Sequence, residues 1–218
     1  ALAPSAAGFD LVATNPPYVR VQSLSDAYAN DLVARYGPLL SGSFSLAPLF
    51  LLAGRELLRD GGVLAVITQN NLFTSLSGKA IRRRLQELGA LRRVVDFGSR
   101  QVFENASAYT CLVFLGASPA AEFEFGELAP DAPLAALRDV PLSRIATASL
   151  QPAKWRLAAP NHLVNLRRIE STGTPLGALA EIRVGFATLK DAVFLVRQVG
   201  DGCVPLNEPG ASPAIELA

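Results

Sequence analysis

The chain has 218 residues, of which 50% are hydrophobic and 18% charged, and this composition excludes an intrinsically disordered protein. The formal net charge of +1 neither favours nor excludes a nucleic-acid partner. The two cysteines and the single histidine lack the spacing of metal ligands, and no apolar run is long enough to span a membrane. We therefore expect a globular protein of the reducing cytoplasm, without a membrane partner.

The first strong element is the apolar run at residues 9–14, which is typical of a buried strand in a parallel sheet. Asn15, Pro16, Pro17 and Tyr18 follow it directly. Proline cannot donate a hydrogen bond to a neighbouring strand, so the strand must end there. Because open α/β sheets bind ligands beyond the carboxyl ends of their strands, these residues form a candidate site. An amide beside a flat ring suits an amino group on a planar ring.

Helices and strands alternate after this motif. The patterns predict helices at 24–36, 46–57 and 81–88, and strands at 63–67, 91–97 and 109–115. Helices between strands imply crossover connections and a parallel sheet with helices on both faces. Residues 98–108 are too few for a crossover helix, so we expect the strand at 109–115 to run antiparallel at the sheet edge.

The composition changes after Gly116. Residues 117–160 are rich in alanine, proline and short polar stretches, with one strand-like piece at 122–125, and they suggest a connector. A helix is expected at 161–170, and strands of a new unit at 181–186 and 192–197. The expected divisions of the chain are therefore 1–116, 117–160 and 161–218.

The tetrapeptide from Asn15 to Tyr18, after an apolar strand, resembles the catalytic motif of S-adenosylmethionine-dependent adenine-N6 DNA methyltransferases. A plain turn with an aromatic plug would use the same residues. The order of the later elements also resembles the second half of the methyltransferase fold, over nearly the whole chain. The resemblance implies an α/β fold class: the C-terminal half of a Rossmann-like methyltransferase sheet with an antiparallel edge strand, followed by the start of a target-recognition domain.

The resemblance implies catalytic roles for Asn15, Pro16 and Tyr18. The Asn15 side-chain oxygen and the Pro16 carbonyl would accept hydrogen bonds from the adenine amine, while Tyr18 stacks on the flipped base. Phe103, in a loop that begins with Gln101, would be a second base-contacting aromatic. As an alternative, Phe103 tucks under the sheet edge.

The implied cofactor is S-adenosylmethionine. Phe50 would pack on its adenine ring, with Asn15 and Pro17 alongside, although Phe50 also fits a plain core position. The glycine-rich cofactor loop of the family should precede Asn15, and only fourteen residues do so here. We therefore expect a fragment of a longer protein that by itself binds the cofactor weakly or not at all. Its sheet would have an open edge at 9–14, through which it would self-associate or pair with the missing half.

The C-terminal part resembles the start of a target-recognition domain in Type II and Type IIG restriction–modification enzymes. The residues that carry this likeness are Trp155-Arg156-Leu157, Pro175-Leu176-Gly177, 182–188 and Phe194. The resemblance implies a catalytic half-domain at 1–116, a connector at 117–160 and the start of the recognition domain at 161–218. The partner would be double-stranded DNA, in a restriction–modification or phage-defence system of the bacterial cytoplasm.

Two alternatives stay open for the activity. One is a protein-glutamine or RNA-adenine methyltransferase, and the other is a catalytically inert nucleic-acid-binding fragment. A basic cluster is also open to two interpretations, because such residues either contact DNA phosphates or form a solvated helix face. The cluster comprises Lys79, Arg82, Arg83, Arg84, Arg92, Arg93 and Arg100.

Overall fold

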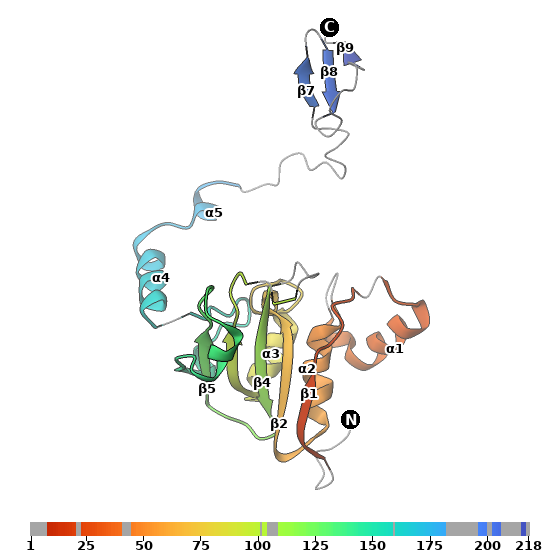
Figure 1. Ribbon diagram of the computed structural model, residues 1–218, viewed down its shortest axis with the longest axis vertical. Coiled ribbons are helices and arrows are strands. Elements are labelled where there is room, and N and C mark those ends of the chain that lie inside the picture. Colours follow the sequence, from red (N-terminus) through yellow and green to blue (C-terminus); the bar gives the residue numbers. More distant parts are fainter. Residues whose placement is uncertain are drawn as a thin grey trace. The chain divides into compact units, whose positions relative to one another are not determined.

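The chain folds into two compact units, residues 1–169 and 170–218. The computed structural model describes residues 8–20, 23–40, 45–100, 102–103, 109–158, 160–181, 196–199, 202–205 and 215–216. Figure 1 shows their ribbon, and each unit is considered by itself. The motifs expected at 182–188 and at Phe194 lie outside the described residues.

A six-stranded sheet forms the centre of the first unit (Figure 1). Its strands are β1 (Phe9–Thr14), β2 (Leu58–Gln69), β3 (Leu91–Asp96), β4 (Thr110–Gly116), β5 (Glu122–Glu127) and β6 (Ser143–Ala146). Their order across the sheet is β1-β2-β4-β3-β5-β6. Strands β1, β2, β3 and β5 run in one direction, and β4 and β6 run in the other. The predicted α/β class is therefore confirmed.

The predicted antiparallel direction of β4 is confirmed, but its predicted place at the sheet edge is wrong. The strand lies between β2 and β3, with Val113 opposite Val66 on one side and Val94 on the other. Its apolar side chains suit this place, because a strand inside such a sheet is covered on both faces. The short connection from β3 therefore turns the chain back into the gap beside β2. The antiparallel strand at the edge of the described sheet is β6.

Three helices accompany these strands: α1 (Asp26–Tyr36), α2 (Ala47–Glu56) and α3 (Lys79–Glu87). Leu49, Leu52 and Leu85 from α2 and α3 are buried in one core cluster with sheet residues such as Leu64. At Gly54 a Cβ atom would lie only 2.9 Å from the Leu64 side chain, so glycine allows α2 to approach the sheet closely. A smaller cluster around Val95, Phe97 and Leu128 packs with the 3-10 helix Leu134–Arg138.

The structure divides the chain at a different place from the expected break after Gly116. Strands β5 and β6 lie in the predicted connector, yet they extend the central sheet. Trp155 is buried in the same core and stacks on Phe73, with 6.4 Å between ring centroids. The first compact unit accordingly continues to Ile169. A recognition role for the residues after it stays a prediction.

The second unit contains short elements. They are α5 (Leu176–Leu179) and the strands β7 (Val196–Val199), β8 (Gly202–Pro205) and β9 (Ile215–Glu216), which form an antiparallel sheet. Helix α4 (Pro160–Thr172) crosses the division between the units. No helix in the described part of the chain is long and apolar enough to cross a lipid bilayer.

The outer edge of β1 is open within the described residues. Strand β1 is at the end of the sheet and pairs there only with β2. Phe9 and Leu11 are 60% and 64% exposed, which is unusual for large apolar side chains of a central sheet. The open edge agrees with the expectation from the sequence, and self-association through it stays a prediction.

Candidate active site

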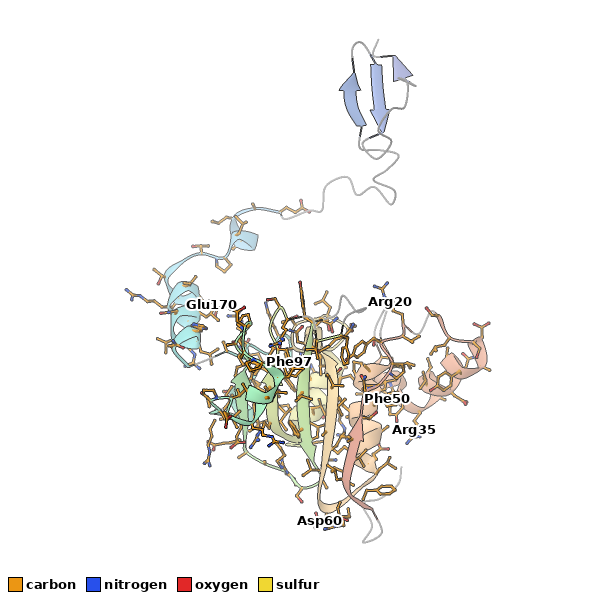
Figure 2. All side chains as sticks on the ribbon, in the orientation of Figure 1. Arg20, Arg35, Phe50, Asp60, Phe97 and Glu170 are labelled. Carbon is orange, nitrogen blue, oxygen red and sulfur yellow. The ribbon has the colours of Figure 1, made fainter. Side chains whose placement is uncertain are left out.

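Three parallel strands end at one edge of the sheet. Thr14 ends β1, Gln69 ends β2 and Asp96 ends β3, and these strands point in the same direction. The Asn-Pro-Pro-Tyr motif therefore leaves β1 at the edge where open α/β sheets bind their ligands. In Figure 2, Arg20 lies at this end of the sheet and Asp60 lies at the opposite end.

The four residues of the motif differ in exposure. Asn15 and Pro17 are exposed, Pro16 is buried and Tyr18 is half-buried. The Tyr18 hydroxyl donates a long hydrogen bond of 3.5 Å to the carbonyl oxygen of Ile67 on β2. Burial, with a smaller contribution from Cys111, raises the pKa of the Tyr18 phenol, so the ring is neutral at physiological pH. The motif thus presents an exposed amide two residues before a half-buried, uncharged aromatic ring.

The Tyr18 ring lines a cavity of about 440 Å³ between the ends of β1 and β2, the start of α2 and the start of α3. We call this the Tyr18 cavity. Its polar lining includes Tyr18, Arg20, Thr68, Gln69, Asn71 and Ser75. Leu49, Leu72 and Ile81 supply apolar walls. Polar residues make up much of this lining, which suits a polar or charged ligand.

The predicted site residues do not all meet in this cavity. Tyr18 lines it, while Phe50 lines a second cavity of about 380 Å³ beside Tyr28 and Tyr36. Leu49 belongs to both linings, so α2 separates the two cavities. Phe103 is half-buried and lines neither of them. Phe50 and Tyr18 thus line different cavities, and the roles of both phenylalanines stay predictions.

A second group of residues at the same edge was missed by the sequence analysis. The Asn70 side-chain amide donates to the Asp96 carboxylate at 3.1 Å and to the Gly98 carbonyl at 3.3 Å. The Asn70 backbone N–H donates to the Tyr109 carbonyl at 3.0 Å. These bonds join the end of β2 to the end of β3 and the start of β4. The polar run Thr68–Asn71, placed directly after an apolar strand, is the signal that could have found them.

The basic cluster is not a single solvated face. Arg82 is fully buried, Arg92 donates to the Gly89 and Leu91 carbonyls, and Arg93 pairs with Glu124 at 2.8 Å. Arg100 donates to the Ala132 carbonyl. These four guanidinium groups bond within the fold, whereas Lys79, Arg83 and Arg84 are exposed, so phosphate contact by the exposed members stays a prediction. Helical spacing predicted that Arg82 faces outward. A local pattern contains no information about the carbonyl groups that distant segments bring to this side chain.

Residues 4–103 match the family described as Eco57I restriction-modification methylase. This range contains the Asn-Pro-Pro-Tyr motif, the Tyr18 cavity and strands β1 to β3. The resemblance to restriction–modification methyltransferases is confirmed. We refer to residues 4–103 as the methylase region.

Curated relatives match about half of this chain and a small part of their own length. The chain is 30% identical over 122 residues to the Type II restriction enzyme and methyltransferase RM.Eco57I of Escherichia coli, which covers 55% of this chain and 12% of that protein. It is 35% identical over 97 residues to the Type II methyltransferase M.BanIII of Aneurinibacillus aneurinilyticus, covering 44% and 16%. The chain therefore spans less than a fifth of each of these relatives.

A solved structure extends the likeness in fold beyond the methylase region. The type IIG restriction endonuclease BpuSI aligns over 85% of this chain and 26% of its own, with 23% identity and a TM-score of 0.53. Identity at this level supports a shared fold and no more. The shared architecture agrees with a Rossmann-like methyltransferase sheet.

Proposed function

We propose that the protein carrying this chain is a site-specific DNA methyltransferase that transfers a methyl group to N6 of an adenine. The observation that carries the proposal is the position of Asn15 and Tyr18. Both lie past the carboxyl end of β1, in a region that matches restriction–modification methylases, and Tyr18 lines a polar cavity there. A plain turn would not require an exposed amide at this edge of the sheet.

Asn15 and Pro16 activate the adenine amine. This amine is a poor nucleophile because its lone pair is delocalised into the ring. Hydrogen bonds from both N6 hydrogens to the Asn15 side-chain oxygen and the Pro16 carbonyl oxygen favour a tetrahedral nitrogen as charge develops. The proline rings hold the backbone in one path, so both acceptors are positioned before the substrate arrives.

Tyr18 holds the target base outside the helix. A base within a duplex must be flipped out before its amine can be reached, at a cost of a few kcal/mol. Stacking on an aromatic ring offsets about 1–3 kcal/mol of this cost. Tyr18 is half-buried and uncharged, which suits a stacking surface, and Phe103 is the second aromatic proposed for the base.

The cofactor proposed is S-adenosylmethionine, which supplies an electrophilic methyl group when bound. The cavity beside Phe50 fits its adenine ring, because Phe50, Tyr28 and Tyr36 give it aromatic walls and Leu32 an aliphatic one. Asn15 and Pro17 are exposed at the end of β1 and are the other residues that we propose to contact the cofactor.

The proposed setting is restriction–modification or phage defence, with double-stranded DNA as the partner. A protein-glutamine or RNA-adenine methyltransferase would use the same Asn-Pro-Pro-Tyr geometry. The similarity to Type II methyltransferases favours the DNA enzyme over both. An inert binding fragment is the third candidate, and it would bind DNA without transferring a methyl group.

Single-molecule sequencing of host DNA provides the test. The full protein that carries this chain would be expressed in a strain lacking its own adenine methyltransferases. We expect N6-methyladenine at one defined sequence, and none with Asn15→Ala. Methylation of RNA or of a glutamine side chain, with unmodified DNA, would contradict the proposal. DNA binding without any methylation by the wild type would support the inert fragment.

A further inference from the structure

We propose that the Tyr18 cavity binds a backbone phosphate of the DNA strand that carries the target base, and that Arg20 is the residue that pairs with it. This inference rests on the proposed function, since it assigns the strand next to the flipped adenine to this cavity. The proposed site lies outside the Asn-Pro-Pro-Tyr motif, and Arg20 is not one of the proposed catalytic residues.

The charge of the cavity favours an anion. Arg20 is the only charged residue among the described residues that line it. The other polar groups of the lining are neutral hydroxyls and amides, including Ser45, Ser75 and Ser77. Hydroxyl, amide and guanidinium groups are the usual donors to phosphate oxygens in protein–DNA contacts. Without a lining carboxylate, the cavity has a positive charge that a phosphate diester would neutralise.

The position of Arg20 is fixed by its neighbours. Arg20 forms an isolated antiparallel bridge with Ser45, and the Leu46 N–H donates to the Val19 carbonyl at 3.0 Å. Arg20 follows Tyr18 by two residues, which places their Cα atoms at most about 7 Å apart. A base stacked on Tyr18 is joined through its sugar to the phosphate beside it. The cation therefore lies within one nucleotide of the proposed stacking ring.

A buried threonine also belongs to the lining. Thr68 is 1% exposed and lines the cavity from the end of β2. Threonine hydroxyls are among the usual donors to phosphate oxygens in protein–DNA contacts.

The wall of the cavity at Ser75 and Gly78 is closely packed. The Ser75 hydroxyl accepts a hydrogen bond of 3.2 Å from the Gly78 N–H. A Cβ atom at Gly78 would lie 2.7 Å from the Arg82 guanidinium and 2.9 Å from Ser75 Oγ, so the turn has no room for a larger residue. Such a wall loses little conformational entropy when a ligand binds.

Binding to single-stranded oligonucleotides tests the proposal without requiring base flipping or methylation. The probes are a short deoxyadenylate strand and the same strand with an uncharged methylphosphonate backbone, each measured by fluorescence anisotropy against the full protein. We expect Arg20→Ala to weaken binding of the charged strand about tenfold, the ratio expected for one lost hydrogen bond to a charged group. The slope of log K against log salt should fall by about 0.7. Arg20→Lys should restore most of both losses.

Two controls make the result specific. Arg144→Ala removes the same charge from the exposed surface of β6, at the other edge of the sheet, and should change affinity less than twofold. On the methylphosphonate strand, wild type and Arg20→Ala should bind equally. Equal binding of the charged strand by wild type and Arg20→Ala would overturn the proposal, as would an equal loss on both strands. Absence of methylation with a retained Arg20 effect would instead contradict the proposed function alone.

Discussion

Arg82 donates a hydrogen bond of 2.7 Å from Nη1 to the carbonyl oxygen of Leu72, at the wall of the Tyr18 cavity. The same guanidinium donates to the carbonyls of Ser75 at 2.9 Å, Pro152 at 2.9 Å and Ala153 at 2.6 Å. The buried Arg82 guanidinium thus joins α3 to the turn after β2 and to Pro152 and Ala153, which follow Arg82 by 70 and 71 residues. Burial lowers the pKa of Arg82, and the group stays charged because its ordinary pKa lies far above neutral pH.

Arg82→Ala should lower the free energy of unfolding by about 3 kcal/mol or more. The substitution leaves several buried carbonyl groups without a donor, and each costs about 1–3 kcal/mol. Urea unfolding of the 218-residue chain provides the measurement. The neighbouring Arg83→Ala is the control, because Arg83 is exposed and its loss should stay within about 0.5 kcal/mol. Equal effects of the two substitutions would show that the buried contacts contribute nothing.

Asn15→Ala in the full protein should abolish methyl transfer and leave the melting temperature nearly unchanged. Asn15 is exposed beyond the end of β1, so its side chain contributes little to the core. Removing an acceptor that is used in the transition state should cost at least a hundredfold in rate. Tritium transfer and thermal unfolding would be measured on the same preparation. Asn30→Ala on the exposed surface of α1 is the control, and a parallel loss of stability and activity would make Asn15 structural.

Tyr18→Ala should weaken binding to DNA with a paired target adenine more than to DNA with a mismatched target. Stacking contributes most where flipping is costly, and a mismatch lowers that cost. Tyr18→Phe is the matched control, because it keeps the ring and removes only the 3.5 Å hydrogen bond to Ile67. The dissociation constants of both duplexes would be compared by anisotropy. Losses of the same size on both duplexes would exclude a stacking role for Tyr18.

Cys111 should make stability fall at alkaline pH. Burial, followed by the charge of Asp96, raises the pKa of its thiol well above the ordinary value. An unfolded thiol loses its proton above about pH 8.5 while the folded thiol keeps it, so the free energy of unfolding decreases as pH rises. The slope from this group approaches about 1.4 kcal/mol per pH unit. Below about pH 8.5 the thiol is protonated in both states, so this group causes no loss of stability there.

The measurement for Cys111 compares Cys203→Ser with the double variant that also carries Cys111→Ala. Unfolding free energies between pH 8 and 10 should decline more steeply when Cys111 is present. Iodoacetamide should not modify Cys111 in the folded chain at pH 8, because the thiol is buried. Rapid modification under native conditions would contradict the assigned burial.

Local patterns in the sequence predicted the helices and strands of the first unit up to Gly116, but not β6. The apolar run at β1, the helical spacing of Leu49 and Ala53 on α2, and the left-handed Gly89 after α3 are signals carried by a few adjacent residues. The Asn-Pro-Pro-Tyr motif belongs to the same class, since its stiff path follows from its own prolines. The family likeness drawn from it was confirmed by the match over residues 4–103.

Features that depend on distant residues could not be predicted in this way. The burial of Arg82 requires carbonyl groups at Pro152 and Ala153, which no helical pattern around Arg82 can reveal. The place of β4 likewise depends on a gap left between β2 and β3. Of the six predicted site residues, Tyr18 alone lines the Tyr18 cavity. A motif gives the order of neighbouring side chains, but it does not predict which distant residues form the other walls of a cavity.

The interior place of β4 sets an order for folding during synthesis. Strands β2 and β3 leave the ribosome before β4, and neither can pair with the other because β4 separates them in the finished sheet. A nascent chain that ends before Thr110 therefore carries two apolar strands with open edges, which favour contacts with other chains. Strand β4 is the one that joins β2 to β3. Pauses in translation just before β4 would prolong the period in which a chaperone is most needed.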